Sequence, residues 1–341
     1  MYQTALTRRR HFRRRELWYV YGVADFVFAT CLPGAEAAVK LEVLRTRPEL
    51  RFAYSRPGLV TFKAPRALAP DDRSGSVFAH VWGRSIGAAG DPVTAAALLA
   101  PHAAQRVHVF ARDAGPTTPI ELAPWQGLGP GGEAQEGELV ADVIVAAEGP
   151  AWLGLHRHDR SRSPHAGGAI PVEVPADAPS RAYAKIEEAI AWAKLPVAAG
   201  QVAVEIGAAP GGAVLALARR GLTVHGVDTG DLAPHVLALP NVHHIAKKVG
   251  AVRWEELPVE VDWLLVDVNL APQVALHEVA RLMPRLRETL AGAVFTLKLN
   301  EWTFVNELPA LVERIRQMGF REVGLRHLPS NRREICAVAR R

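Results

Sequence analysis

A buried strand that runs directly into a glycine-rich turn is the feature that most restricts the fold. The apolar run at 202–206 is followed by Gly207-Ala-Ala-Pro-Gly211-Gly212 and then by a helical pattern. Glycines let the backbone approach a ligand closely, and the N-terminus of the following helix attracts a carboxylate or phosphate. Asp228 closes the next predicted strand, where its carboxylate would reach both hydroxyls of a ribose. The segment therefore predicts a nucleotide-type cofactor site at the end of a parallel strand.

Strands and helices alternate through this half of the chain. Strands are expected at 202–206, 222–228, 242–247, 263–268, 293–299, 321–328 and 333–340, and helices at 181–192, 211–220, 272–288 and 304–318. Ser180 is a candidate N-cap for the first of these helices. Continuous apolar strands such as 263–268 are typical of a sheet covered on both faces. The pattern predicts a doubly wound α/β domain.

The first half of the chain has a different order of predicted strands and helices. Strands are expected at 18–31, 51–55, 59–62, 106–111 and 139–147, with helices at 35–44 and 93–99. This order suits a small α+β layer. Residues 113–138 are rich in proline and glycine and predict a long loop, and residues 156–180 predict a linker. We expect domains at 18–170 and 171–341, preceded by a tail at 1–17.

Composition bounds the class of protein. The chain has 341 residues, 49% of them hydrophobic, which fits two globular domains and excludes wholesale disorder. Its two cysteines, Cys31 and Cys336, are too few and too far apart in sequence for a disulfide scaffold or a thiolate zinc site, which favours a reducing compartment. Asp25 interrupts the apolar run at 17–30, which therefore predicts a buried strand and not a signal peptide. No segment approaches the ~20 apolar residues of a membrane span, and we expect a cytoplasmic protein.

The positive charge is concentrated at the start of the chain. Of the net charge of +5, an excess of six arginines lies in residues 1–15, which contain no acid. The tail is expected to be disordered, and it could bind phosphates or act as a plain solubilising extension.

Two details favour S-adenosylmethionine over NAD as the cofactor. The turn is spaced G-x-x-x-G-G with Pro210 inside it, unlike the G-x-G-x-x-G of dinucleotide-binding folds. The chain also ends with two adjacent predicted strands joined by a short turn, and an antiparallel hairpin that closes the sheet is characteristic of class I methyltransferases. A purely structural turn remains the alternative for the glycines alone.

Charged residues on several predicted strands and on one predicted helix of the second half of the chain resemble those of a known enzyme family. The glycine turn and the segments 266–267, 296–299 and 333–335 resemble FtsJ-type ribose 2′-O-methyltransferases. That family carries a Lys-Asp-Lys-Glu tetrad, which falls on Lys185, Asp267, Lys298 and Glu334. The resemblance is most specific to the ribosomal RNA large subunit methyltransferase M group and covers most of the chain. It implies a C-terminal class I (Rossmann-like, seven-stranded) methyltransferase domain and an N-terminal α+β domain, ferredoxin-like with a reduced THUMP-like module, that presents RNA.

The chemistry of methyl transfer explains these residue types. A ribose hydroxyl is a weak acid, so its proton must leave as the oxygen attacks the sulfonium methyl carbon. We expect Lys298 to act as the base, its pKa lowered by burial and by the neighbouring Lys185 ammonium. Asp267 would orient Lys298 and the methyl group, and Glu334 would hold Lys185 or the ribose. Each residue taken alone could instead be an ordinary ion-pair partner.

The resemblance also assigns residues to the cofactor. They are Ser180, Gly207, Ala209, Pro210, Gly211, Gly212, Asp228 and Asp267. The sequence departs from the family after the third strand, where Lys247 and Lys248 stand in place of an acid near the adenine amino group. A lysine cannot accept that hydrogen bond, so backbone atoms or stacking would have to hold the adenine.

Other motifs give weaker predictions. Arg332 and Arg333 flank Glu334, where a ribose-phosphate chain would pass, and are predicted RNA contacts. The histidines at 156, 158 and 165 suggest a metal site, but their position in a predicted linker argues against converging ligands, and no metal is expected.

The function expected from all of this is S-adenosylmethionine-dependent 2′-O-methylation of RNA, at a cytidine of 23S ribosomal RNA. A catalytically silent relative that binds RNA is the first alternative, and an NAD-linked oxidoreductase is the second. The modified nucleotide and the oligomeric state are not determined by these patterns.

Overall fold

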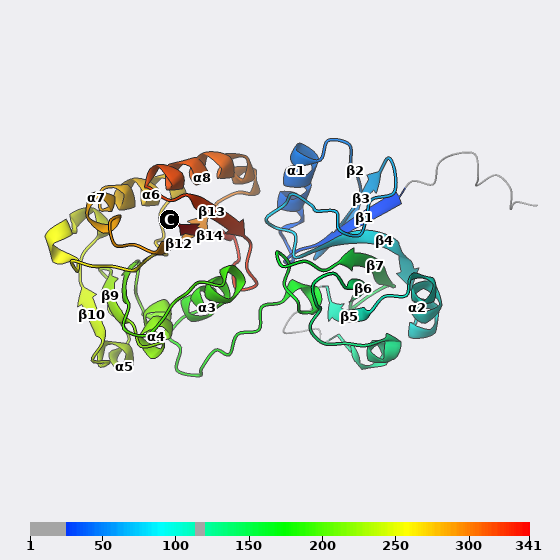
Figure 1. The fold of residues 1–341 in the computed structure, drawn as a ribbon, viewed down its shortest axis with the longest axis horizontal. Coiled ribbons are helices and arrows are strands. Elements are labelled where there is room, and N and C mark those ends of the chain that lie inside the picture. The colour runs from blue at the N-terminus through cyan, green and yellow to red at the C-terminus, as the bar shows by residue number, and fades with distance from the viewer. Residues whose placement is uncertain (1–24, 113–119) are drawn as a thin grey trace, which may run out of the picture.

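The computed structural model describes residues 25–112 and 120–341, which form two seven-stranded sheets lying side by side (Figure 1). The predicted tail at 1–17, the beginning of the first predicted strand and part of the proline- and glycine-rich loop lie outside the described residues. We call the residues up to 170 the N-terminal half and the remainder the C-terminal half.

The sheet of the N-terminal half has the order β2-β3-β1-β4-β7-β6-β5. Its neighbouring strands are antiparallel, except that β5 and β6 run parallel. Its strands are β1 (Asp25–Thr30), β2 (Arg51–Arg56), β3 (Leu59–Ala64), β4 (Val81–Ala89), β5 (Arg106–Ala111), β6 (Leu139–Val145) and β7 (Ala151–Arg157). Its helices are α1 (Glu36–Thr46) and α2 (Pro92–Leu99), with short 3₁₀ segments η1 (Ala100–His102), η2 (Ala123–Leu128) and η3 (Ala166–Gly168). This is an α+β half, whereas its ferredoxin-like and THUMP-like assignments stay predictions.

Two central strands of this sheet, β4 and β7, were not expected from the sequence. Both contain glycines, which weaken a strand pattern. A Cβ atom on Gly154 would lie 2.0 Å from the Phe28 ring, and one on Gly83 would lie 2.4 Å from the Leu155 carbonyl oxygen. Both positions must therefore be glycine, because the fully buried Phe28 ring packs against the backbone of β4 and β7 there. Because β7 ends at Arg157, the prediction that a linker begins at 156 was wrong.

The sheet of the C-terminal half has the order β10-β9-β8-β11-β12-β14-β13. Only β14 runs antiparallel to its neighbours, so the sheet ends in the predicted hairpin, and the fold is that of a class I methyltransferase. Its strands are β8 (Val202–Ile206), β9 (Thr223–Val227), β10 (Val242–Ile245), β11 (Trp263–Val266), β12 (Gly292–Lys298), β13 (Glu322–Arg326) and β14 (Glu334–Arg340). Its helices are α3 (Ala182–Ala193), α4 (Gly212–Arg219), α5 (Pro234–Leu237), α6 (Pro272–Ala280), α7 (Met283–Leu286) and α8 (Leu308–Gln317), with 3₁₀ segments η4 (Val249–Ala251), η5 (Trp254–Glu256) and η6 (Trp302–Glu307).

Helices cover both faces of this second sheet (Figure 1). Helices α6, α7 and α8 pack on one face, where Leu276 and Leu311 share a buried cluster with Phe295. Helices α3, α4 and α5 pack on the other face, around residues such as Ile190 and Leu215. Burial on both faces explains why the strands read as continuous apolar runs.

Three predicted helix boundaries needed correction. The helix predicted at 272–288 is interrupted after α6, and α7 restarts with Pro284 in its first turn, where proline is tolerated. The helix predicted at 304–318 begins as the 3₁₀ segment η6. Ser180 is not the N-cap of α3. Arg181 occupies that position, and the Ser180 Oγ accepts a hydrogen bond from the Ala182 N–H at 3.3 Å.

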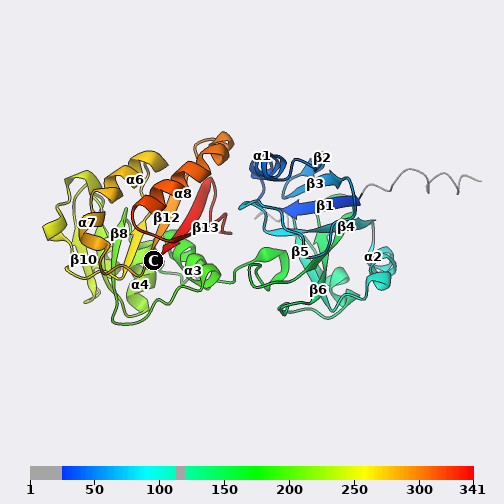
Figure 2. The ribbon, with the colours of Figure 1, turned by 45° about the horizontal axis from the view of Figure 1, so that its top comes forward.

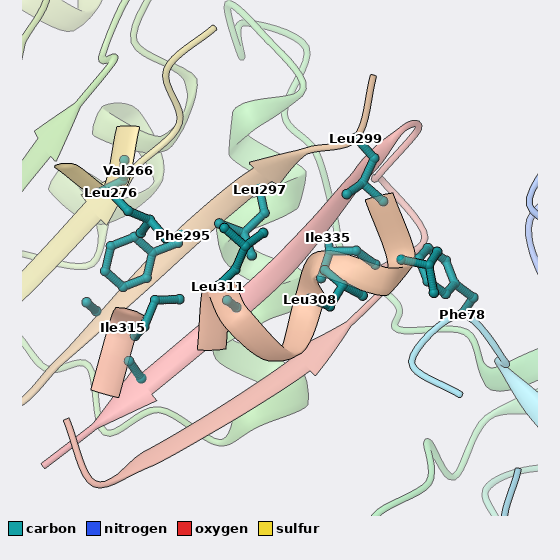
Figure 3. Close-up of a cluster of buried hydrophobic side chains, with 14 of the residues drawn as sticks. Phe78, Val266, Leu276, Phe295, Leu297, Leu299, Leu308, Leu311, Ile315 and Ile335 are labelled. Atoms are coloured by element: carbon teal, nitrogen blue, oxygen red, sulfur yellow. The ribbon is translucent and has the colours of Figure 1, made fainter. Parts of the chain in front are cut away.

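The loop before β4 joins the two halves. Phe78 is fully buried, with its ring centroid 5.9 Å from that of Trp302 and 5.3 Å from that of His327. Figure 3 shows Phe78 at one end of the apolar cluster of the C-terminal half, and in the turned view of Figure 2 α1 lies next to the segment that leads into α8. The His327 N–H also donates to the Val77 carbonyl oxygen at 3.0 Å. None of the helices in the described ranges has the length and apolar character needed to cross a membrane.

Candidate active site

The four predicted catalytic side chains come together at one edge of the second sheet. Asp267 follows β11 directly, Lys298 is the last residue of β12, and Glu334 is the first residue of β14. Because β11 and β12 run parallel and β14 runs antiparallel to them, these three positions share an edge. Lys298 and Glu334 are also direct cross-strand partners. Lys185 reaches the same point from the first turns of α3.

The four groups form a closed ring of alternating charges. The Lys185 Nζ lies 3.0 Å from Asp267 Oδ2 and 2.6 Å from Glu334 Oε2. The Lys298 Nζ lies 2.8 Å from Asp267 Oδ1 and 2.7 Å from Glu334 Oε1. The side chains are between 11% and 20% exposed, so the ring is partly shielded from water. Each ammonium is bound to both carboxylates, which fixes all four groups in one geometry.

The electrostatics of the ring correct one expectation. Burial lowers the pKa of Lys298, but the Asp267 and Glu334 carboxylates outweigh burial and raise that pKa above 10.5. The lowered pKa predicted for the base is therefore wrong for the protein as it stands in this structure. The pKa of Asp267 shifts the other way. Burial raises it, and the two ammonium groups outweigh burial and lower it.

The glycine turn beside the ring has the conformation that glycine permits. Gly207 has φ +89° and Gly211 has φ +106°, both in the left-handed region. A Cβ atom on Gly207 would lie 2.4 Å from the Asp267 carbonyl oxygen, so the turn packs directly against the strand end that carries Asp267. The Ala209–Pro210 peptide bond is cis. Gly207 therefore couples the predicted cofactor turn to the charged ring.

Two further predicted cofactor residues face this turn. The Asp228 Oδ2 accepts a hydrogen bond from the Ala209 N–H at 3.0 Å, and its Oδ1 accepts one from the Gly230 N–H at 2.9 Å. These bonds orient the carboxylate and leave lone pairs on each oxygen for further donors. On the other side, a Cβ atom on Gly212 would lie 2.2 Å from the Ser180 Oγ, so Ser180 lies against the start of α4.

Glu205 is a buried acid that the sequence analysis missed. It is 1% exposed, and its Oε2 has no hydrogen-bond partner among the described residues. Together with Lys185, Asp267 and Thr296 it lines a small cavity beside the charged ring. Burial raises the pKa of Glu205 well above 4.5, and the charges of Asp267 and Asp228 raise it further. The available signal was an acid inside an otherwise apolar strand.

Replacing Glu205 by glutamine is expected to stabilise the protein by about 1–3 kcal/mol at neutral pH, because it removes the cost of a buried, incompletely bonded acid. A raised folded-state pKa costs stability as pH rises above the unfolded value of 4.5, so the gain should vanish below that pH. Urea unfolding between pH 4 and pH 8 measures it. Glu188→Gln is the matched control. Burial raises the pKa of Glu188 as well, but both of its oxygens accept hydrogen bonds from Ser330, so its replacement should bring a smaller gain. Equal effects of the two variants would contradict the argument.

The remaining predicted residues lie in different surroundings. Arg332 and Arg333 are exposed beside buried Glu334, and their RNA contact stays a prediction. The Lys247 Nζ lies 2.5 Å from Glu256 Oε1, so an acid does stand near the position where the family's acid is missing. His156 is buried in β7 with its Nδ1 2.5 Å from Asp142 Oδ2, which places it in the sheet and not in a linker. Within the described ranges, no group of three or more potential ligand side chains is arranged for a metal ion.

Comparisons with known proteins give a consistent set of relatives. No protein-family model matches the chain. The ribosomal RNA large subunit methyltransferase M of Halorhodospira halophila is 38% identical over 176 residues, which cover 50% of this chain and 49% of the relative. The same enzyme of Alkalilimnicola ehrlichii is 34% identical over 219 residues, 60% of this chain and 54% of the relative. That of Dickeya chrysanthemi is 29% identical over 212 residues, 59% and 57% of the two chains.

Solved structures are more distant. TrmN from Thermus thermophilus is 16% identical with a TM-score of 0.37, covering 93% of this chain and 99% of that chain. The chain spans about half the length of the curated relatives it matches. Over that span, the resemblance inferred from the glycine turn and the charged residues is confirmed: this chain is similar to ribosomal RNA large subunit methyltransferase M.

Proposed function

We propose that the protein is an S-adenosylmethionine-dependent RNA ribose 2′-O-methyltransferase that acts on a cytidine of 23S ribosomal RNA in the cytoplasm. The observation that carries the proposal is the closed ring of Lys185, Asp267, Lys298 and Glu334 beside the glycine turn. Relatives that carry the name of a large-subunit ribosomal RNA methyltransferase support the substrate class. The antiparallel β13–β14 pair argues against the dinucleotide fold of an NAD-linked oxidoreductase.

The residues around the turn fit the proposed cofactor. Gly207 and Gly211 shape the turn that leads into the N-terminus of α4, which would attract the carboxylate of the cofactor's amino-acid end. Asp228, already oriented by two backbone N–H groups, would accept hydrogen bonds from the ribose hydroxyls. Ser180 lies against Gly212 at the start of α4. When bound, the cofactor supplies an electrophilic methyl group on a sulfonium.

Lys298 is the proposed acceptor of the ribose 2′-hydroxyl proton. In the ring its ammonium is held charged by Asp267 and Glu334, so it must first lose a proton to act as a base. The positive sulfonium of a bound cofactor would lower the pKa of the nearby Lys298 ammonium. Exclusion of water from Lys298 by bound RNA would lower that pKa further. Lys298 would then accept the hydroxyl proton as the oxygen bonds to the methyl carbon, and the sulfur–methyl bond of the bound cofactor would break to release a neutral thioether.

The other members of the ring position this step. Asp267 and Glu334 each bind both lysines, so they hold Lys298 at a fixed distance from Lys185. The Lys185 ammonium would stabilise negative charge that develops on the ribose oxygen. Fixed geometry of this kind can supply a large share of the rate enhancement, because the reacting groups need no further ordering.

A direct assay tests the proposal. The full chain is incubated with tritiated S-adenosylmethionine and deproteinised 23S ribosomal RNA from cells that lack the gene, and ribose methylation is mapped by resistance to alkaline hydrolysis. Incorporation at one cytidine is expected. RNA binding and cofactor binding without incorporation would instead identify a catalytically silent relative, and failure to bind the cofactor in calorimetry would exclude the methyltransferase.

A further inference from the structure

Two surface pockets meet between the two halves of the protein. One is lined by the loop before β4, and the other by the segment that follows β7 and by the end of α3. The two pockets share Ser161, Arg162, Trp192 and Arg326, and we call the joined pockets the arginine groove. The basic side chains that line it outnumber the acidic ones: Arg73, Arg160, Arg162, Lys194 and Arg326 against Glu133 and Glu136.

Arg326 is the half-buried basic group of this groove that no carboxylate of the described residues compensates, whereas Lys194, which also has no ion pair there, is exposed. The Arg326 side chain is half-buried at the end of β13, and its Nη2 donates to the His80 carbonyl oxygen at 3.3 Å. No carboxylate of the described residues lies within ion-pair distance of it. Burial, and then repulsion by Arg162, lower the pKa of Arg326 to about 10, so it stays charged at neutral pH. Burying a guanidinium without a carboxylate partner costs desolvation free energy, and a bound anion would offset that cost.

Arg162 is held in place beside Arg326 by the fold. Its Nη1 donates to the Trp82 carbonyl oxygen at 2.6 Å and its Nη2 to the Asp72 carbonyl oxygen at 2.8 Å. Among the described residues, the carboxylate within ion-pair distance of it is Asp159 at 3.4 Å, which is shared with Arg73. Arg162 therefore adds positive charge behind Arg326 but has few donors left for a ligand.

The groove lies at the same edge of the sheet as the charged ring. Arg326 pairs with Cys336 across β13 and β14, and Cys336 is two residues from Glu334, the cross-strand partner of Lys298. Strands are about 4.8 Å apart and the two residues are offset by two positions along them, so the backbone of Arg326 lies roughly 12 Å from that of Lys298. Helix α3 connects the two places as well, because Lys185 is part of the ring and Trp192, two turns further on, lines the groove. A short stretch of one RNA strand would span this distance.

We propose that the arginine groove binds a backbone phosphate of the RNA substrate, with Arg326 as the direct contact. The inference rests on the proposed function, since it takes the polyanion at this edge to be the substrate RNA. Arginine suits this task because its planar donors match phosphate oxygens. Trp192 offers a ring in the same groove on which a neighbouring base can stack. A phosphate contact at this distance would orient the strand so that a ribose reaches Lys298.

The test measures binding of a fluorescein-labelled single-stranded RNA of mixed sequence to the full chain by anisotropy over a range of salt concentrations. Arg326→Gln is expected to raise the Kd about tenfold at low salt and to reduce the slope of log K against log salt by about 0.7, the loss of one phosphate contact. Arg326→Lys should keep the slope. Arg321→Gln is the matched control, because Arg321 is exposed just before β13 at the opposite edge of the sheet, and it should change neither quantity.

Each outcome decides the proposal. An unchanged slope for Arg326→Gln, or equal weakening by Arg321→Gln, would overturn it, as would competition by a polyglutamate peptide as strong as that by unlabelled RNA. Circular dichroism and thermal melting of both variants show whether the fold is intact. If Arg326→Gln does not fold, Arg326→Lys decides the question: it should raise the Kd because an ammonium cannot make the paired contacts of a guanidinium with phosphate, and an unchanged Kd would overturn the proposal. Calorimetry with S-adenosylmethionine is run in parallel. If the unaltered protein does not bind the cofactor, the proposed methyltransferase activity is refuted, whereas the binding of RNA in the arginine groove is still decided by the anisotropy measurements.

Discussion

Lys298→Ala is expected to lower the single-turnover rate of methyl transfer by about a thousandfold, because general-base catalysis contributes roughly 10²- to 10⁴-fold. The substitution removes the proposed proton acceptor and leaves Asp267 and Glu334 paired with Lys185 alone. The rate is measured by rapid quench with enzyme in excess over RNA. Cofactor affinity, measured by calorimetry, should change little, since Lys298 lies on the substrate side of Asp267 in the proposed arrangement.

Lys298→Arg separates the base from the charge. Arginine keeps the positive charge that neutralises the two carboxylates, but it does not lose its proton in proteins. This variant should fold as well as the unaltered protein and still be inactive. A variant with arginine that retained most of the rate would show that Lys298 acts through its charge and would refute the role of proton acceptor.

The same model of the base sets the expected pH dependence. Because the carboxylates hold the pKa of Lys298 above 10.5, only a small fraction is neutral at pH 7, and that fraction grows as pH rises. The single-turnover rate should therefore rise about tenfold per pH unit at first and level off at the pKa of Lys298 in the complex. A flat profile between pH 6 and pH 9 would argue against a lysine base.

Gly207→Ala is expected to destabilise the C-terminal half by about 3 kcal/mol, the sum of left-handed backbone strain and of overpacking. Gly207 has φ +89°, and the added Cβ atom would lie 2.4 Å from the Asp267 carbonyl oxygen. Native-state hydrogen exchange of the β8 and β11 amides measures the loss locally. Because the clash falls on the strand end that carries Asp267, methyl transfer should be lost as well.

Gly200→Ala is the matched control for this substitution. Gly200 has φ +86° and lies in the same half, just before β8, but nothing lies within 4 Å of its added Cβ atom. It carries the backbone strain alone, about 1–2 kcal/mol. If the two alanine variants lost the same free energy of unfolding, the close contact between the turn and Asp267 would contribute nothing to the destabilisation.

Much of the candidate site could be predicted because its residues lie at the ends of strongly patterned elements. Strand β8 was placed correctly from its apolar run, and the apolar run of β12 placed Lys298 at the end of that strand. The carboxyl ends of parallel strands share an edge, so residues at those ends converge whatever the intervening chain does. Glu205 escaped notice because burial of an acid is a property of the packed strand and helices, not of its neighbours in sequence.

The amino-acid sequence by itself determined the doubly wound half and the glycine turn, because periodicity and spacing along the chain encode them. The four charged residues were assigned through the family resemblance of the motifs that carry them. Only the tertiary structure decided which charges compensate one another. It closed the ring of two lysines and two carboxylates and reversed the expected pKa shift of Lys298. It left Arg326 with no carboxylate of the described residues within ion-pair distance. It also decided strands β4 and β7, whose glycines make room for Phe28. Such outcomes depend on distances between atoms that are remote in sequence, and Coulomb and packing energies act on those distances alone.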